Sequence, residues 1–157
     1  MTGMICDTAL NVTNHLAANF LFAHGAAIIV PSSELDQEAI IQLAAHGGSY
    51  GYVVYGKREL MLSEYCVINA VEQDSDKKAC GLCRQHSYYL QDRKQRRFPL
   101  LCDEQCRMHL LEETAEDHIH RISKLQKQGI HQFFCILTNE DQQESANILA
   151  AIVKQLA

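Results

Sequence analysis

The chain has 157 residues, of which 47% are hydrophobic and 21% charged. A chain of this length and composition can fold as one domain that buries about 70% of its unfolded surface, so no disulfide is needed to hold it together. Its seven cysteines are odd in number, and no signal-peptide pattern precedes them, which argues against a secreted disulfide scaffold. We expect reduced thiols and a cytoplasmic location. No apolar run is long enough to cross a membrane.

The charge is unevenly distributed along the chain, whose net charge is -5. Between residues 77 and 97 there are seven basic residues and one acid, a local charge of +6 that leaves -11 for the remainder. Such a patch can attract phosphate groups, although a solvated loop is the more common explanation of a charge run.

Apolar runs typical of strands alternate with helical patterns in the first third of the chain. Strands are expected at residues 4–8, 26–30 and 50–55, and helices at residues 12–24 and 33–45. The first helix has apolar residues at helical spacing: Val12, Leu16, Phe20 and Leu21. The second follows a capping-box-like run that begins at Ser33.

A long polar segment follows the third strand and carries most of the cysteines and basic residues. From Asp103 the pattern is helical again, with a new cap at Thr114 and a stripe formed by Ile119, Ile122 and Leu125. A fourth strand is expected at residues 131–137. Asn139 would then cap a last helix, whose apolar side is formed by Leu149, Ile152, Val153 and Leu156.

Four βα units can form either an open doubly wound sheet or half of an eight-stranded (β/α)8 barrel of TIM type. Asp7, Thr8 and Ala9 follow the first strand, where a nucleotide-binding fold would have a glycine-rich loop. We therefore predict an α/β half-barrel in a single domain over residues 1–157, with a cysteine-rich and basic insertion at residues 57–103.

The most specific chemical pattern is a set of four cysteines with 13, 2 and 22 residues between successive members: Cys66, Cys80, Cys83 and Cys106. A CxxC pair delivers two sulfurs to one point, and distant cysteines can complete a four-sulfur site. Cys102 is a reserve for the fourth ligand. Cys6 and Cys135 lie in predicted strands as small buried hydrophobes. Spacing alone leaves free thiols, zinc and an iron-sulfur cluster open.

Other catalytic candidates come from the carboxyl ends of the predicted strands, where barrel enzymes place their functional residues. They are Asp7, Asn11, Glu34 and Tyr55. Asn11 and Glu34 have an equally good explanation as helix caps. The G-x-S-x-G pattern at residues 47–51 follows a helix and opens a strand, the reverse of a nucleophile elbow.

Several motifs together carry a family resemblance. They are YGKRELMLSEYC at residues 55–66, CGLC at 80–83, LQDR at 90–93, FP at 98–99 and DEQCR at 103–107, with LNV at 10–12 and SEL at 33–35. This set resembles the collagenase-like peptidases of unassigned catalytic type, peptidase family U32, over nearly the whole chain. The resemblance implies the second half of that family's barrel, without the first half.

The resemblance implies two chemistries. Some members are described as collagen-degrading peptidases, whereas others resemble oxygen-independent hydroxylation factors that hold an iron-sulfur cluster and act on RNA bases or a quinone ring. A peptidase needs a nucleophile beside a base or an open metal position, whereas four cysteines close a metal site. We therefore prefer a 4Fe-4S cluster, with zinc as the alternative. A peptidase and a non-catalytic partner subunit remain the alternative functions.

Partners follow from the same residues. If the cluster faces tRNA or rRNA, phosphates would be contacted by Arg84, Arg93, Lys94, Arg96 and Arg97, and Tyr88 and Tyr89 would stack on bases. A half-barrel would also leave two strand edges unpaired, which predicts a homo-oligomer or a second chain that supplies the other strands.

Overall fold

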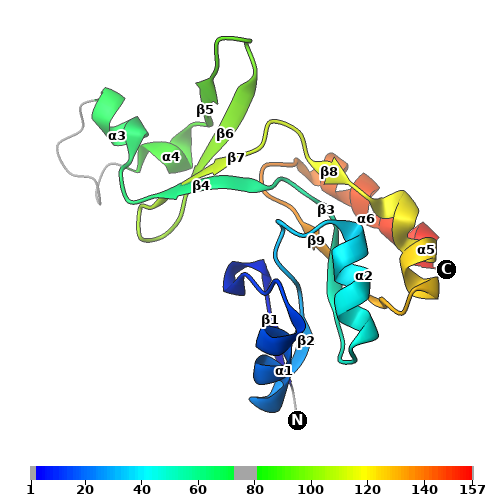
Figure 1. Cartoon of the computed structure of the whole chain (residues 1–157). Helices are drawn as coiled ribbons and strands as arrows, with labels where there is room; N and C mark the ends of the chain where they lie inside the picture. The colour runs from blue at the N-terminus through cyan, green and yellow to red at the C-terminus, as the bar shows by residue number, and fades with distance from the viewer. Residues whose placement is uncertain (1–2, 73–80, 157) are drawn as a thin grey trace. The chain divides into compact units, whose positions relative to one another are not determined.

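The computed structural model describes residues 3–72 and 81–156, and the chain divides into two compact units (Figure 1). Unit 1 comprises residues 1–56 and 116–157, and unit 2 comprises residues 57–115. Each unit has its own sheet structure and its own cluster of buried apolar side chains. The chain is therefore a mixed α/β protein in which the cysteine-rich segment belongs to unit 2.

The strands of unit 1 run parallel in chain order, apart from one short strand. They are β1 (Met4–Cys6), β2 (Ala26–Ile29), β3 (Gly51–Gly56) and β9 (Gln132–Ile136). β1 pairs with β2 and β3 pairs with β9, and a single parallel bridge between Ile29 and Tyr50 connects the two pairs. The short strand β8 (Glu116–Asp117) pairs antiparallel with the end of β3.

Helices separate these strands, and each long helix begins where a polar side chain caps it. They are η1 (Thr8–Leu10), α1 (His15–Ala23), α2 (Gln37–Ala45), η2 (Ile119–Arg121), α5 (Ile122–Lys127) and α6 (Gln142–Leu156). The side chains of Asn14, Asp36 and Asp141 accept the amide N–H three residues ahead, at 2.8 to 3.0 Å. Within the described ranges, no helix is both long and apolar enough to cross a membrane.

These caps correct three predicted helix starts. The first helix begins at His15 rather than at residue 12, and the second begins after Asp36 rather than at Ser33. The last begins after Asp141, because Asp141 and Glu144 exchange hydrogen bonds in a capping box that Asn139 does not form.

The helix predicted from Asp103 is wrong, because residues 103–107 form a hairpin turn. The Asp103 carboxylate accepts the amides of Gln105 and Arg107, both at 2.9 Å, and these bonds stabilise a turn instead of a first helical turn. No helix is capped at Thr114 either, since residues 116 and 117 form β8.

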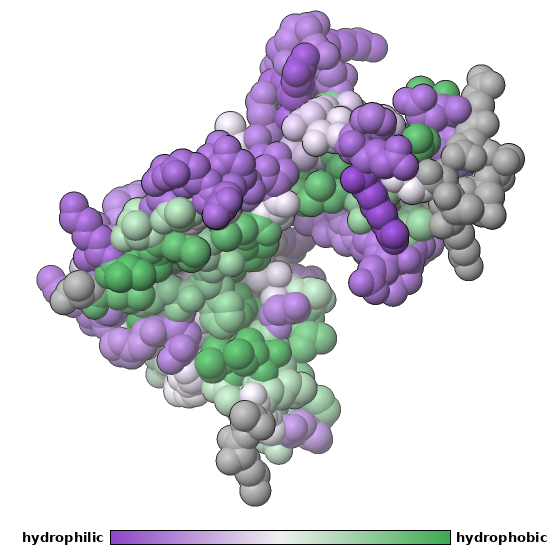
Figure 2. Space-filling model, turned by 180° about the vertical axis from the view of Figure 1, so that it is seen from behind, coloured by the Kyte–Doolittle hydropathy of each residue, from purple (hydrophilic) through white to green (hydrophobic). Residues whose placement is uncertain are grey.

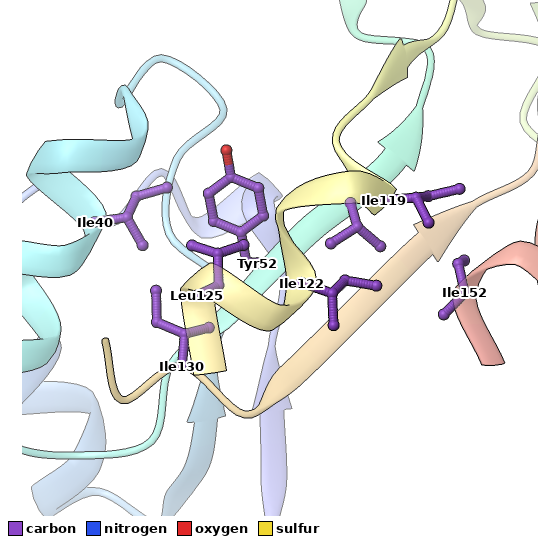
Figure 3. Close-up of a cluster of buried hydrophobic side chains, with 8 residues drawn as sticks. Ile40, Tyr52, Ile119, Ile122, Leu125, Ile130 and Ile152 are labelled. Atoms are coloured by element: carbon purple, nitrogen blue, oxygen red, sulfur yellow. The ribbon is translucent and has the colours of Figure 1, made fainter. Parts of the chain in front are cut away.

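The main core of unit 1 lies where α2, β3, α5 and α6 meet (Figure 3). Its buried members are Ile40, Tyr52, Val54, Ile119, Ile122, Leu125, Ile130 and Ile152. The predicted stripe of Ile119, Ile122 and Leu125 is therefore confirmed. The stripe predicted for the first helix is confirmed only in part: Val12 is buried and Leu21 packs against the core, whereas Leu16 and Phe20 are exposed.

Unit 2 is built on an antiparallel sheet with the strand order β4-β7-β6-β5. The elements are β4 (Glu59–Ser63), α3 (Val67–Glu72), α4 (Leu82–Gln85), β5 (Tyr88–Gln91), β6 (Arg97–Cys102) and β7 (Met108–Leu111). Two tight hairpins join β5 to β6 and β6 to β7. A small apolar cluster joins α3 to β6 and β7 through Cys66, Ile68, Leu100 and Met108.

Leu125→Ala should destabilise unit 1 strongly. Leu125 is fully buried, and its truncation leaves a cavity that costs about 2–5 kcal/mol in the free energy of unfolding. Leu62→Ala in β4 is the matched control, because that leucine is exposed and its truncation should cost under about 0.5 kcal/mol. Chemical denaturation followed by circular dichroism measures both. Equal effects would contradict the assignment of this core.

Candidate metal centre

Three cysteines of unit 2 come together although they lie far apart in sequence. Cys66 precedes α3, Cys83 lies in α4, and Cys102 ends β6. Cys83 and Cys102 pack against the apolar cluster that contains Cys66, and the three thiols are close enough to interact electrostatically. Cys102, the reserve ligand in the sequence analysis, is therefore the residue that the fold places beside Cys66 and Cys83.

The surroundings of these thiols are apolar. Cys66, Leu100 and Met108 are buried, and Cys83 and Cys102 pack against them. Burial, together with the charges that Cys83 and Cys66 would carry as thiolates, raises the pKa of Cys102 to about 12. A thiol whose pKa is raised in this way becomes a thiolate when a nearby cation compensates its charge, as a bound metal does.

A backbone amide points at one of the sulfurs. The N–H of Asn69 donates to Sγ of Cys66 at 3.5 Å, at the start of α3. Such N–H···S contacts stabilise thiolate ligands and tune the potential of clusters bound to them. The sulfur of Cys66 is thus held by its helix as well as by its apolar neighbours.

The structure describes only one of the other two cysteines of the predicted set. Cys80 lies outside the described residues. Cys106 occupies the β6–β7 turn with a φ of 60°, and its amide donates to the Asp103 carbonyl. No three His, Cys, Asp or Glu residues in ranges 3–72 and 81–156 are arranged at ligand spacing, and this includes Cys66, Cys83 and Cys102.

The two cysteines predicted as buried hydrophobes lie in unit 1. Cys6 is fully buried in β1 against Val12 and Ala18, which confirms the prediction for this residue. Cys135 in β9 is half-buried, and burial together with the nearby Glu140 raises the pKa of its thiol.

The two hairpin turns of unit 2 share one construction. Asp92 accepts the amides of Lys94 and Arg96, as Asp103 accepts those of Gln105 and Arg107. In each turn the arginine also forms an ion pair with its aspartate. The residue before each arginine has positive φ, 66° at Gln95 and 60° at Cys106.

The basic side chains of unit 2 are not equivalent. Arg96 is held by Asp92 at 2.8 Å and lies 5.0 Å above the ring of Phe98. The side chains of Arg84, Arg93, Lys94 and Arg97 are exposed. Lys77 and Lys78 lie outside the described residues. The tip of the β5–β6 hairpin therefore presents Arg93 and Lys94 to solvent.

The two tyrosines proposed for base stacking lie on opposite faces of β5. Neighbouring residues of a strand alternate between its two faces. Tyr88 packs against the thiol-bearing cluster, whereas Tyr89 is exposed. Tyr89 is therefore the one available to an aromatic partner.

The candidates at the carboxyl ends of the unit 1 strands mostly serve local structure. Asp7 caps η1 by accepting the Ala9 amide at 3.0 Å, and Asn11 ends it in the left-handed conformation. Glu34 is exposed, and its amide donates to the hydroxyl of Ser32 at 3.2 Å. The cap explanation thus holds for Asn11.

Tyr55 has a partner that sequence reasoning missed. Its hydroxyl donates to Oε1 of Glu140 at 3.3 Å, and Oε2 of Glu140 accepts the amides of Thr138 and Asn139. Burial and the Glu140 carboxylate raise the pKa of Tyr55. Glu140 follows the fourth strand at the same edge of the sheet, which is the sequence signal that could have identified it.

The comparisons with known proteins decide the family. Residues 4–148 match the model of peptidase family U32. The chain belongs to peptidase family U32. No curated protein and no solved structure gives a significant match. The family match contains all of unit 2 and every strand of unit 1, so the thiol cluster lies within the matched length of this U32 chain.

Tyr55→Phe should lower the stability of this U32 protein modestly. It removes one hydrogen bond to a half-buried carboxylate, which is worth about 0.5–1.5 kcal/mol in the free energy of unfolding. Tyr89→Phe is the control, because Tyr89 is exposed in unit 2. Denaturation curves of the two variants measure the difference. An unchanged Tyr55→Phe protein would show that the bond has no structural role.

Proposed function

We propose that this U32 family protein binds an iron-sulfur cluster in unit 2 and takes part in oxygen-independent hydroxylation of RNA. The packing of Cys66, Cys83 and Cys102 in one apolar cluster is the observation that carries the proposal. Family membership supports it, because the resemblance links such cysteines to cluster-bearing hydroxylation factors.

The donor set suits a cluster. Thiolates are the ordinary ligands of 4Fe-4S centres, and an apolar shell limits the access of water. Cys66, Cys80 and Cys83 would hold three irons, with Cys102 or Cys106 at the fourth. When bound, the cluster would supply one-electron transfer. Zinc, the alternative, would use the same four-sulfur shell without redox chemistry.

The same unit offers a surface for nucleic acid. Arg93 and Lys94 are exposed at one hairpin tip, and Tyr89 is exposed on the adjoining strand. Cations that contact phosphate and aromatic rings that stack on unpaired bases are the usual means of binding single-stranded RNA. tRNA or rRNA is the partner that this combination favours.

We further propose that the four parallel strands of unit 1 form half of an eight-stranded barrel. The pairings β1–β2, β2–β3 and β3–β9 follow chain order, which is the order of a barrel rather than of a doubly wound sheet. In such a barrel the Tyr55–Glu140 pair would lie at the end that carries function.

A peptidase is the second candidate, and the family match is the observation that favours it. Incubation with denatured collagen distinguishes it from the first. Cleavage by the purified protein that persists after iron is removed would favour the peptidase.

Serine substitutions should identify the cluster ligands. In protein purified without oxygen, Cys66→Ser, Cys83→Ser and Cys102→Ser should each lose most of the bound iron and the visible absorbance of the cluster. Cys135→Ser is the matched control, because that half-buried cysteine lies in unit 1. Iron analysis and absorbance spectra measure the outcome.

Two results would change this assignment. Iron retained in Cys102→Ser but absent from Cys106→Ser would assign the fourth position to Cys106. Stoichiometric zinc without iron in oxygen-free preparations would contradict the cluster.

Neutralising the hairpin tip should weaken RNA binding. Arg93→Gln with Lys94→Gln should reduce affinity for tRNA and lower the salt dependence by roughly 0.7 to 0.9 for each phosphate that is no longer neutralised. The control is Lys124→Gln with Lys127→Gln, which removes two positive charges from α5 in unit 1. Filter binding at several salt concentrations measures both. Equal effects of the two double variants would refute a specific surface.

The reaction itself has a direct test. RNA from cells that lack this protein should contain one nucleoside that is lighter by one oxygen atom, as measured by mass spectrometry. Complementation with Cys83→Ser should fail to restore it, whereas Cys135→Ser should succeed. Unchanged RNA would contradict the RNA substrate.

A further inference from the structure

The β5–β6 hairpin of unit 2 has two unlike faces, which the pairing of its strands identifies. Residues directly opposite each other on antiparallel strands point to the same face, and neighbours along one strand point to opposite faces. Tyr88 pairs with Leu100, and both pack in the cluster that contains the thiols. Tyr89 therefore lies on the other face. We call this the outer face of the hairpin, formed by Tyr89, Gln91, Arg97 and Pro99.

The outer face exposes an aromatic ring beside a cation. Tyr89 is 46% exposed, and Arg97 is exposed as well. Pro99 is the residue directly opposite Tyr89, so Arg97 is its diagonal neighbour, at a distance of about 7–8 Å that long side chains span. Only the amide of Arg97 bonds to Glu113, whose carboxylate accepts it at 3.2 Å. A ring and a guanidinium are thus available side by side.

The cations of this hairpin differ in whether the protein neutralises them. Arg96 forms an ion pair with Asp92. Among the described residues, none forms an ion pair with Arg97 or with Arg93 and Lys94 at the hairpin tip. This tip is hydrophilic in the space-filling view (Figure 2). The hairpin therefore offers three positive charges to an anionic partner.

We propose that the outer face binds an unpaired nucleotide of the RNA, and that this nucleotide is an anchor and not the one to be modified. Its base stacks on Tyr89, while Arg97 and the two cations of the tip contact the flanking phosphates. The thiols lie on the opposite face of the sheet, so a base stacked on Tyr89 cannot reach them at the same time. This inference rests on the proposed function and adds where the RNA is held.

An unpaired nucleotide fits the outer face better than a duplex or an acidic protein does. An A-form duplex presents phosphates and hydroxyl groups but no free base plane for an aromatic ring. Protein interfaces concentrate their energy in a cluster of buried apolar and aromatic side chains. On this face a single exposed ring, Tyr89, is accompanied by Gln91, Arg97 and a polar tip.

Tyr89→Ala tests the stacking contact. It should weaken the binding of single-stranded RNA by about 5- to 100-fold, whereas Tyr89→Phe, which keeps the ring, should bind within about twofold of the unchanged protein. Leu90→Ala is the matched control, because Leu90 is 41% exposed on the same strand and pairs with Phe98 on the opposite face. Filter binding with one RNA sequence, single-stranded and annealed to its complement, measures the affinities.

A tryptophan reporter shows on which face the base lies. The chain contains no tryptophan, so Tyr89→Trp and Leu90→Trp each carry a single such fluorophore, on opposite faces of β5. Single-stranded RNA should quench the fluorescence of Tyr89→Trp and leave that of Leu90→Trp nearly unchanged. Equal quenching of both, or of neither, would overturn the proposal.

The remaining outcomes separate this inference from the proposed function. RNA binding that does not depend on Tyr89, or that is as tight for the duplex or for polyglutamate, would overturn the inference alone. An unchanged protein that binds no RNA at low salt would overturn the RNA partner as well. Iron content is measured in parallel: Tyr89→Ala should keep the iron of the unchanged protein, and its loss would contradict the separation of the two faces.

Discussion

The parallel pairing of β3 with β9 is the constraint on which both units depend. These strands are neighbours in space but enclose the whole of unit 2 in sequence. β3 and β9 approach each other closely at the end of β3, because a Cβ on Gly56 would lie 2.9 Å from Cβ of Ile136. Glycine is therefore required at the residue that leaves unit 1. β8 then pairs with Tyr55 and Gly56 where the chain returns.

Unit 2 begins and ends with a second set of pairings. The amide of Glu112 donates to the carbonyl of Arg58 at 2.9 Å, and β4 pairs with β7 along its length. The chain thus enters and leaves this unit through adjacent backbone segments. An insertion connected in this way can bring distant cysteines together without disturbing the parallel strands, because loop closure is already accomplished by backbone hydrogen bonds.

Polar and apolar side chains are distributed differently in the two units. Unit 2 gathers three thiols in an apolar cluster and exposes cations on its hairpins, where aspartates order the turns. Unit 1 buries its middle elements and leaves apolar side chains at both ends of the strand order. Parallel sheets are ordinarily covered on both faces.

The sequence by itself determined the βα alternation, the positions of the four parallel strands to within a few residues, and the family. Those features depend on local periodicity and on short motifs, which a linear chain displays directly. It did not determine the hairpins after Asp103, because side-chain bonds from Asp103 to the backbone overrode a helical pattern. Nor did it show that α1 exposes Leu16 and Phe20, since periodicity identifies an apolar face but not what covers it. The cysteine spacing grouped Cys66 with Cys83 and left Cys102 in reserve, and only the tertiary structure brought Cys102 into their cluster. Only the tertiary structure placed Tyr55 beside Glu140, because the separation of these two residues in sequence carries no spacing signal.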